Sequence, residues 1–97
     1  MKLIIKEEQW KLNFRTGKQK VKTTDKKKIK CLIGKSVVFV KGQHCFLIND
    51  VTDDSVSFTV LYAEERHNKE WRLRKGERTF YRPFSSNDGY QYCFSVK

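Results

Sequence analysis

The sequence predicts an all-β fold: a small antiparallel β-sandwich or barrel of about seven to eight short strands. Three observations predict it. Apolar and polar residues alternate with a period of two, turn residues separate the alternating segments, and no long helical pattern lies between them. The chain has 97 residues, 13% of them aromatic, and this length allows one hydrophobic core. We therefore expect a single all-β domain over residues 1–97.

Several segments have the alternation or the β-branched and aromatic composition of half-buried strands. Turn residues such as Thr16-Gly17, Gly34-Lys35 and Lys75-Gly76 separate them. These segments are residues 10–15, 29–33, 36–41, 43–48, 55–62, 71–73 and 90–96. The side chains expected in the core are Trp10, Leu12, Phe14, Val38, Val40, Phe46, Val56, Phe58, Val60, Trp71, Leu73, Tyr92 and Phe94.

One stretch also fits a helix. Thr24-Asp25 could cap a helix over residues 26–33 that ends at Gly34. Its first turn would hold Lys26, Lys27 and Lys28, where the helix dipole disfavours positive charge. The strand interpretation is therefore preferred.

Positive charge is concentrated in the first half of the chain. The formal net charge is +10, and residues 1–42 hold 13 Lys and Arg against 3 Asp and Glu, whereas residues 43–97 hold 8 of each. Twelve of the 13 cations in the first half are lysines. A one-sided, lysine-rich field attracts polyanions and indicates nucleic acid or an acidic protein as the partner.

Six lysines fall into a regular pattern within this half. If residues 18–22 pair with residues 26–30 as a hairpin across Thr23-Thr24-Asp25, the six side chains share one face and oppose one another. Directly opposed like charges destabilise an antiparallel pair, so a bound anion would stabilise it. Protection of an exposed sheet edge from aggregation is the other explanation, and it weighs slightly more for these residues taken alone. The predicted polyanion-binding residues are Lys18, Lys20, Lys22, Lys26, Lys28 and Lys30.

The segment 78–82 contains a conflict of alternation. If Phe80 is buried, Arg78 and Arg82 point inward with it; if Tyr81 is buried, Phe80 is exposed between the two arginines. A β-bulge or twisted edge near Pro83 that packs both aromatics inward is the preferred explanation. The alternative is that Arg78, Phe80 and Arg82 form a surface for base stacking or for an interface with a protein.

The sequence offers no pattern typical of a catalytic or metal site. Cys31, Cys45 and Cys93 are widely spaced within apolar segments, so we expect buried free thiols. His44 and Cys45 are neighbours on a candidate strand, and we expect Cys45 in the core and His44 on the surface. A Cys–His nucleophilic pair using His44 or His67 stays open, although no spacing orients one. We expect no enzymatic activity, no metal and no cofactor.

The apolar runs are far shorter than the roughly 20 residues that span a bilayer. The segment Leu3–Ile5 is also too short for a signal peptide, so we expect a cytoplasmic protein with no membrane partner. The leading hypothesis is a non-enzymatic binding domain whose basic half contacts a polyanion, foremost nucleic acid, with little sequence readout. The alternative is a small protein-interaction module, an adaptor or an inhibitor, that presents a basic face to an acidic protein.

Overall fold

A computed structural model describes residues 1–61, 69–83 and 88–97 and shows eight strands in two four-stranded antiparallel sheets. Sheet A has the strand order β2-β1-β8-β7, and sheet B has the order β3-β4-β5-β6. The strands are β1 (Lys2–Leu12), β2 (Gln19–Lys30), β3 (Ser36–Phe39), β4 (His44–Val51), β5 (Ser55–Leu61), β6 (Glu70–Arg74), β7 (Arg78–Tyr81) and β8 (Asp88–Val96). The described residues form no helix, so none has the length and apolar character to cross a membrane.

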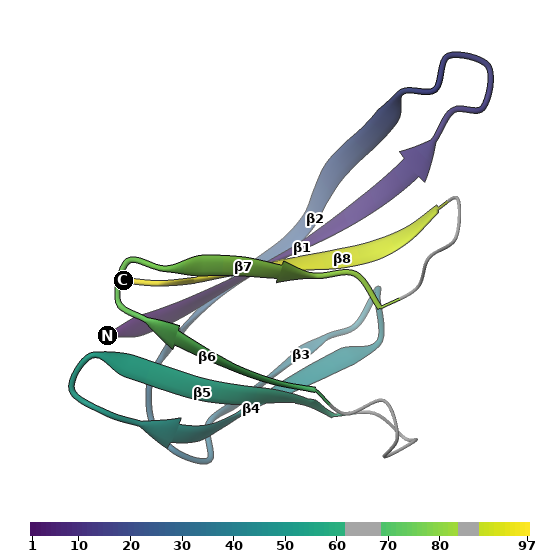
Figure 1. Ribbon diagram of the computed structural model, residues 1–97. Helices are drawn as coiled ribbons and strands as arrows, with labels where there is room; N and C mark the ends of the chain where they lie inside the picture. The colour runs from purple at the N-terminus through teal and green to yellow at the C-terminus, as the bar shows by residue number, and fades with distance from the viewer. Residues whose placement is uncertain (62–68, 84–87) are drawn as a thin grey trace.

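The two sheets pack face to face as a sandwich, which confirms the all-β prediction and decides against a closed barrel (Figure 1). The chain forms β1 and β2 of sheet A, then the whole of sheet B, and returns to sheet A with β7 and β8. Its two ends lie side by side, because Lys2 and Lys97 exchange backbone hydrogen bonds of 2.7 and 3.0 Å. The end of the predicted 55–62 strand and His67 lie outside the described residues.

The first hairpin differs from the predicted lysine hairpin. Residues 19–30 form the single strand β2, which pairs with β1 rather than folding back on itself. The turn of the β1–β2 hairpin lies at residues 13–18, where the Asn13 amide donates to the Lys18 carbonyl oxygen at 2.9 Å. The helix considered for residues 26–33 is also wrong. Figure 1 shows this hairpin extending well past the end of sheet B.

A β-bulge interrupts the hairpin in its middle. The pairing passes from Glu7↔Asp25 to Glu8↔Thr23, so Thr24 is an extra residue on β2. The Thr24 hydroxyl oxygen lies within hydrogen-bond distance of both the Glu7 backbone carbonyl oxygen (3.2 Å) and its carboxylate Oε1 (2.7 Å). An extra residue reverses which face the following side chains occupy. The bulge therefore determines where each lysine of β2 points.

Aromatic rings from both sheets meet in the core. The ring of Phe94 on β8 lies between three rings of sheet B, with centroid distances of 5.2 Å to Phe46, 4.8 Å to Phe58 and 5.0 Å to Trp71. Tyr92 also packs on Phe46 at 5.1 Å. Edge-to-face and tilted rings at these separations add to the apolar area buried between the sheets.

Most of the predicted core is confirmed, with three errors. Phe14, Val38 and Val40 are 74%, 54% and 81% exposed. Phe14 lies in the turn of the hairpin, past the reach of sheet B. In residues 37–40 the chain buries Val37 and Phe39 instead of Val38 and Val40. Burying a valine and a phenylalanine removes more apolar area from water than burying two valines would. Leu12 and Trp71 are half-buried. Trp10 is buried as expected, but on the outer face of sheet A and outside the core cluster.

Candidate functional site

The outer face of sheet A is turned away from sheet B and carries most of the cations of both candidate sites. Side chains of directly opposed residues share a face of a sheet, so the pairing of the four strands assigns its members. We call this surface the basic face. Its residues are Lys2, Ile4, Lys6, Glu8 and Trp10 on β1; Lys26, Lys28 and Lys30 on β2; Cys93 and Ser95 on β8; Arg78 and Phe80 on β7; with Arg82 and Lys97 directly after β7 and β8.

Two rows of residues cross this face from one edge to the other. The first row contains Phe80, Cys93, Lys6 and Lys26 in turn. In the second row Arg78 opposes Ser95, and the row continues through Ile4 to Lys28. Each row therefore begins with a residue of β7, Phe80 in the first and Arg78 in the second, and ends with a lysine of β2.

The bulge divides the six predicted lysines. Lys26, Lys28 and Lys30 lie on the basic face, where Lys26 opposes Lys6 and Lys30 opposes Lys2. On the other side of the bulge, Lys22 opposes Gln9 and Lys20 opposes Lys11, so their side chains occupy the opposite face of the hairpin. Lys18 lies in the hairpin turn. The prediction that all six share one face and oppose one another is therefore wrong, although the opposition of like charges occurs with other partners.

In residues 78–82 a regular strand can bury either Phe80 or Tyr81, and the structure exposes Phe80. Tyr81 is buried and packs against Trp71 at a centroid distance of 4.9 Å, whereas Phe80 is 64% exposed. The expectation that a bulge packs both aromatics inward is wrong, because β7 pairs with β8 in a regular register. The second candidate set thus lies on the same face as Lys26, Lys28 and Lys30.

Polar contacts hold Arg82 in place beside the aromatic residues. Its guanidinium lies 4.1 Å from the ring centroid of Trp10, and its Nε and Nη2 donate to Gln91 Oε1 at 3.1 and 2.6 Å. Gln91 Nε2 donates in turn to Glu8 Oε1 at 3.1 Å, and Lys6 Nζ lies 3.6 Å from Glu8 Oε2. Polar contacts therefore connect four side chains from three adjacent segments.

Glu8 and Cys93 are coupled through a hydrogen bond. Partial burial raises the pKa of Glu8, but hydrogen bonds from Cys93 and Gln91 and the nearby Lys6 ammonium outweigh it, and the pKa is lowered overall. Burial and the Glu8 carboxylate raise the pKa of the Cys93 thiol to about 11. The thiol is therefore protonated near neutral pH and donates to Glu8 Oε1 at 3.0 Å.

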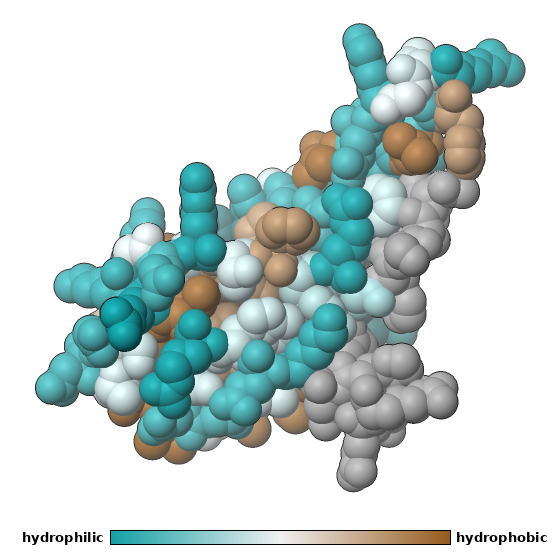
Figure 2. Space-filling view, viewed as in Figure 1, coloured by the Kyte–Doolittle hydropathy of each residue, from teal (hydrophilic) through white to brown (hydrophobic). Residues whose placement is uncertain are grey.

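A shallow depression occupies the middle of the basic face, with a volume of about 900 Å³. Ile4, Cys93 and Ser95 line it together with Phe80, and Lys6 and Arg78 contribute cations. Figure 2 shows apolar side chains among hydrophilic ones above β7 and along the β1–β2 hairpin. The surface thus combines a partly apolar depression, an exposed aromatic ring and an excess of positive charge, with Glu77 as a carboxylate in the lining.

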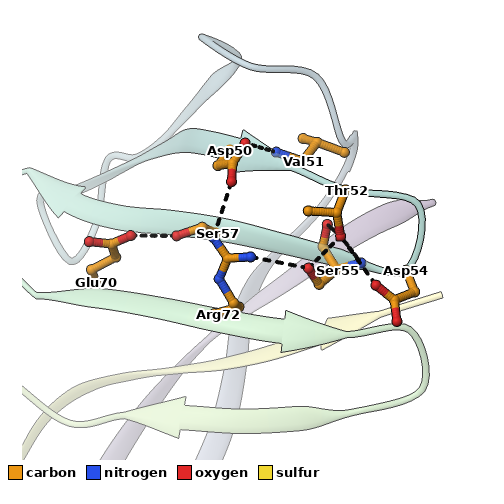
Figure 3. A network of polar contacts seen from close by, with 8 residues as sticks. All are labelled: Asp50, Val51, Thr52, Asp54, Ser55, Ser57, Glu70 and Arg72. Carbon is orange, nitrogen blue, oxygen red and sulfur yellow. Dashed lines mark hydrogen bonds and ion pairs between the residues drawn. The ribbon is translucent and has the colours of Figure 1, made fainter.

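Some of the charged groups on the outer face of sheet B are paired. Arg72 Nη2 lies 3.1 Å from Asp50 Oδ2, and the Ser57 hydroxyl donates to Glu70 Oε1 at 2.5 Å (Figure 3). Among the described residues no carboxylate lies within ion-pair distance of Lys26, Lys28 or Lys30. These three lysines therefore carry positive charge that no described carboxylate neutralises.

A second polar cluster is buried between the sheets, and the sequence analysis missed it. Glu7 is 1% exposed, and its carboxylate accepts hydrogen bonds from Thr24 (2.7 Å), the Gly42 amide (3.1 Å) and the Tyr92 hydroxyl (2.9 Å). A Cβ at position 42 would overlap the Tyr92 hydroxyl and the Glu7 carboxylate, so glycine is needed there. Because Leu3, Ile4 and Ile5 are all apolar, alternation in the sequence did not assign Glu7 to the inner face.

His44 belongs to this buried cluster. It is 4% exposed, its Nδ1 donates to the Gly42 carbonyl oxygen at 2.6 Å, and it lies 3.0 Å from the Tyr92 hydroxyl oxygen. Burial lowers the pKa of His44, against the opposing influence of the Gly42 carbonyl and Glu7. The expectation of a surface His44 beside a core Cys45 is therefore wrong. Hydrogen bonds offset the cost of burying the imidazole, and Cys45 is half-buried on the other face of the strand.

The described cysteines are all free thiols, with Cys31 buried and Cys45 and Cys93 half-buried. Burial raises the pKa of Cys31 and of Cys45. Within the described residues no group of three or more His, Cys, Asp or Glu side chains is arranged to hold a metal ion.

Comparison with known proteins gives no relative from which a role could be transferred. No family model matches the chain, and neither the curated proteins nor the solved structures include a significant match.

Proposed function

We propose that the basic face binds nucleic acid, mainly through phosphate contacts and with little sequence readout. The observation that carries the proposal is convergence: Lys26, Lys28 and Lys30 share one face with Arg78, Phe80 and Arg82. Unpaired lysines supply the sequence-independent attraction to phosphates, and arginines add bidentate contacts. Cytoplasmic location and the absence of catalysis belong to the same proposal.

The lysine pairs on the basic face support this interpretation. Lys6 opposes Lys26 and Lys2 opposes Lys30, and directly opposed like charges destabilise a β-sheet. At Lys6 the nearby Glu8 carboxylate offsets part of this repulsion. A fold that keeps such pairs on a face where carboxylates could replace them gives up stability there. A bound polyanion removes this repulsion, because each phosphate can lie between two ammonium groups.

A pair of charge-reversal variants tests where the contact lies. Lys26→Glu/Lys28→Glu/Lys30→Glu changes the basic face, and Lys18→Glu/Lys20→Glu/Lys22→Glu changes the net charge equally on the hairpin. Fluorescence polarisation with mixed-sequence single-stranded and duplex oligonucleotides over a salt series measures both. We expect the wild type to bind single strands with a slope of log affinity against log salt of about −2 to −4. The variant of Lys26, Lys28 and Lys30 should lose about two units of slope and at least about tenfold in affinity.

The hairpin variant should lose clearly less affinity than the variant of the basic face. Equal losses in both would show attraction to net charge and would contradict a site on sheet A. No binding by the folded wild type at low salt would overturn the proposal and leave the acidic-protein alternative, tested next by pull-down. Thermal unfolding supplies the control for folding, since replacing Lys26 and Lys30 creates opposite-charge pairs with Lys6 and Lys2 and should not destabilise the sheet.

A further inference from the structure

We infer that the basic face selects single-stranded over duplex nucleic acid by stacking an unpaired base on Phe80. This inference rests on the proposed function and specifies its ligand. Its starting point is the position of Phe80, which is 64% exposed while the neighbouring Tyr81 fills the inward place in the core. Packing therefore does not require an aromatic side chain at residue 80.

The surroundings of Phe80 fit a nucleotide. Phe80 lines the central depression with the apolar Ile4 and the small Ser95, which leaves room for a planar group beside the ring. Lys6 is two strands away from Phe80, and Lys26 is three strands away, or about 10 and 14 Å between backbones at the usual strand spacing. Long lysine side chains extend over this gap, so a base on Phe80 can place its phosphates between β8 and β2.

Two arginines flank Phe80 in the sequence. Arg78 precedes Phe80 by two residues on the same face, and Arg82 follows it by two. Arg82 is fixed over the Trp10 ring and bonded to Gln91, so its positive charge stays on the basic face. Its guanidinium is therefore placed to contact a neighbouring phosphate without first losing side-chain freedom.

A duplex cannot use this arrangement. Paired bases are stacked on one another inside a duplex, and only their edges reach the grooves. The ring of Phe80 can meet the face of a base only when that base is unpaired, as in other single-strand sites that combine aromatic side chains with a positive surface. Duplex binding to this face is then limited to phosphate contacts, and the single strand has the added energy of stacking.

Phe80→Ala and Phe14→Ala are the matched variants for this inference. Both remove an exposed phenyl group from sheet A or its hairpin, and surface changes of this kind leave the free energy of unfolding within about 0.5 kcal/mol. The probes are a fluorescein-labelled oligothymidylate and a mixed-sequence duplex of equal length. We expect the wild type to bind the oligothymidylate more tightly, and Phe80→Ala to weaken that binding about five- to hundredfold.

Duplex affinity and the salt slope should not change in Phe80→Ala, and Phe14→Ala should bind both probes like the wild type. Phe80→Trp should retain the single-strand preference, and its added fluorescence should be quenched by the oligothymidylate. Equal effects of the two alanine variants, or equal weakening of both probes, would overturn the stacking inference. If the Lys26/Lys28/Lys30 variant still loses salt-dependent binding in that case, the proposed function stands; if the wild type binds neither probe, both fail.

Discussion

Replacing Glu7 with alanine should lower the free energy of unfolding by about 3–5 kcal/mol. The carboxylate is buried and accepts hydrogen bonds from Thr24, the Gly42 amide and Tyr92. Its removal leaves these donors without their acceptor in a place that water does not easily reach. Urea denaturation followed by tryptophan fluorescence measures the loss.

Glu7→Gln is the control for shape. Its Oε1 can still accept from the Gly42 amide and Tyr92, and its amide nitrogen can face the Thr24 hydroxyl, which rotates to accept instead of donate. We expect this variant to lose about 1–2 kcal/mol, clearly less than Glu7→Ala. Equal stability of the wild type and Glu7→Ala would show that the buried cluster does not stabilise the contact between the two sheets.

The second large effect is expected at Phe94. Phe94→Ala should lower the free energy of unfolding by about 3–5 kcal/mol, because it deletes a buried ring and leaves a cavity. The ring is 1% exposed and contacts Phe46, Phe58 and Trp71 of the opposite sheet. The same urea titration measures this change.

Phe14→Ala is the matched control, since it makes the same chemical change on a ring that is 74% exposed. It should change stability by no more than about 0.5 kcal/mol. Comparable losses in the two variants would mean that the hairpin turn packs into the core and would contradict the sandwich as described.

The fold class was predictable because strands with one buried face alternate strictly. Val56, Phe58 and Val60 are all buried, as are Tyr92 and Phe94, and in each segment the alternation is unambiguous. The segment Val37–Val40 is apolar at every position, so alternation permits two registers. The choice depends on Phe39, whose ring packs on Phe46 and Tyr92 at centroid distances of 6.0 and 5.3 Å, and that contact involves two other strands.

The lysine hairpin was mispredicted because Thr23-Thr24-Asp25 has the composition of a turn. In the structure these residues remain in β2, where Thr24 forms the bulge and bonds to Glu7. Nothing in the spacing of the lysines reveals a bulge, because it depends on a buried carboxylate of the neighbouring strand. The pairing partner, β1, was also hard to find, since Leu3, Ile4 and Ile5 are all buried and show no alternation.

The candidate site was predictable in part of its residues but not in its assembly, since Lys18, Lys20 and Lys22 lie away from the basic face. The conflict at Phe80 and Tyr81 marked a place where local rules fail, which is where functional residues are expected. Lys26 and Phe80 lie on one face of sheet A because of its strand order, β2-β1-β8-β7. That order joins the two ends of the chain in one sheet, and alternation within single segments carries no information about it.

The measurement that tests the central claim most directly is a titration of the isotopically labelled protein with an oligothymidylate, followed by two-dimensional NMR of the backbone amides. The claim predicts that chemical-shift changes concentrate at residues 26–30, 78–82 and 91–95, with few changes in sheet B. Changes centred on the outer face of sheet B, around Val38 and Leu61, or on the hairpin turn at residues 13–18, would contradict it.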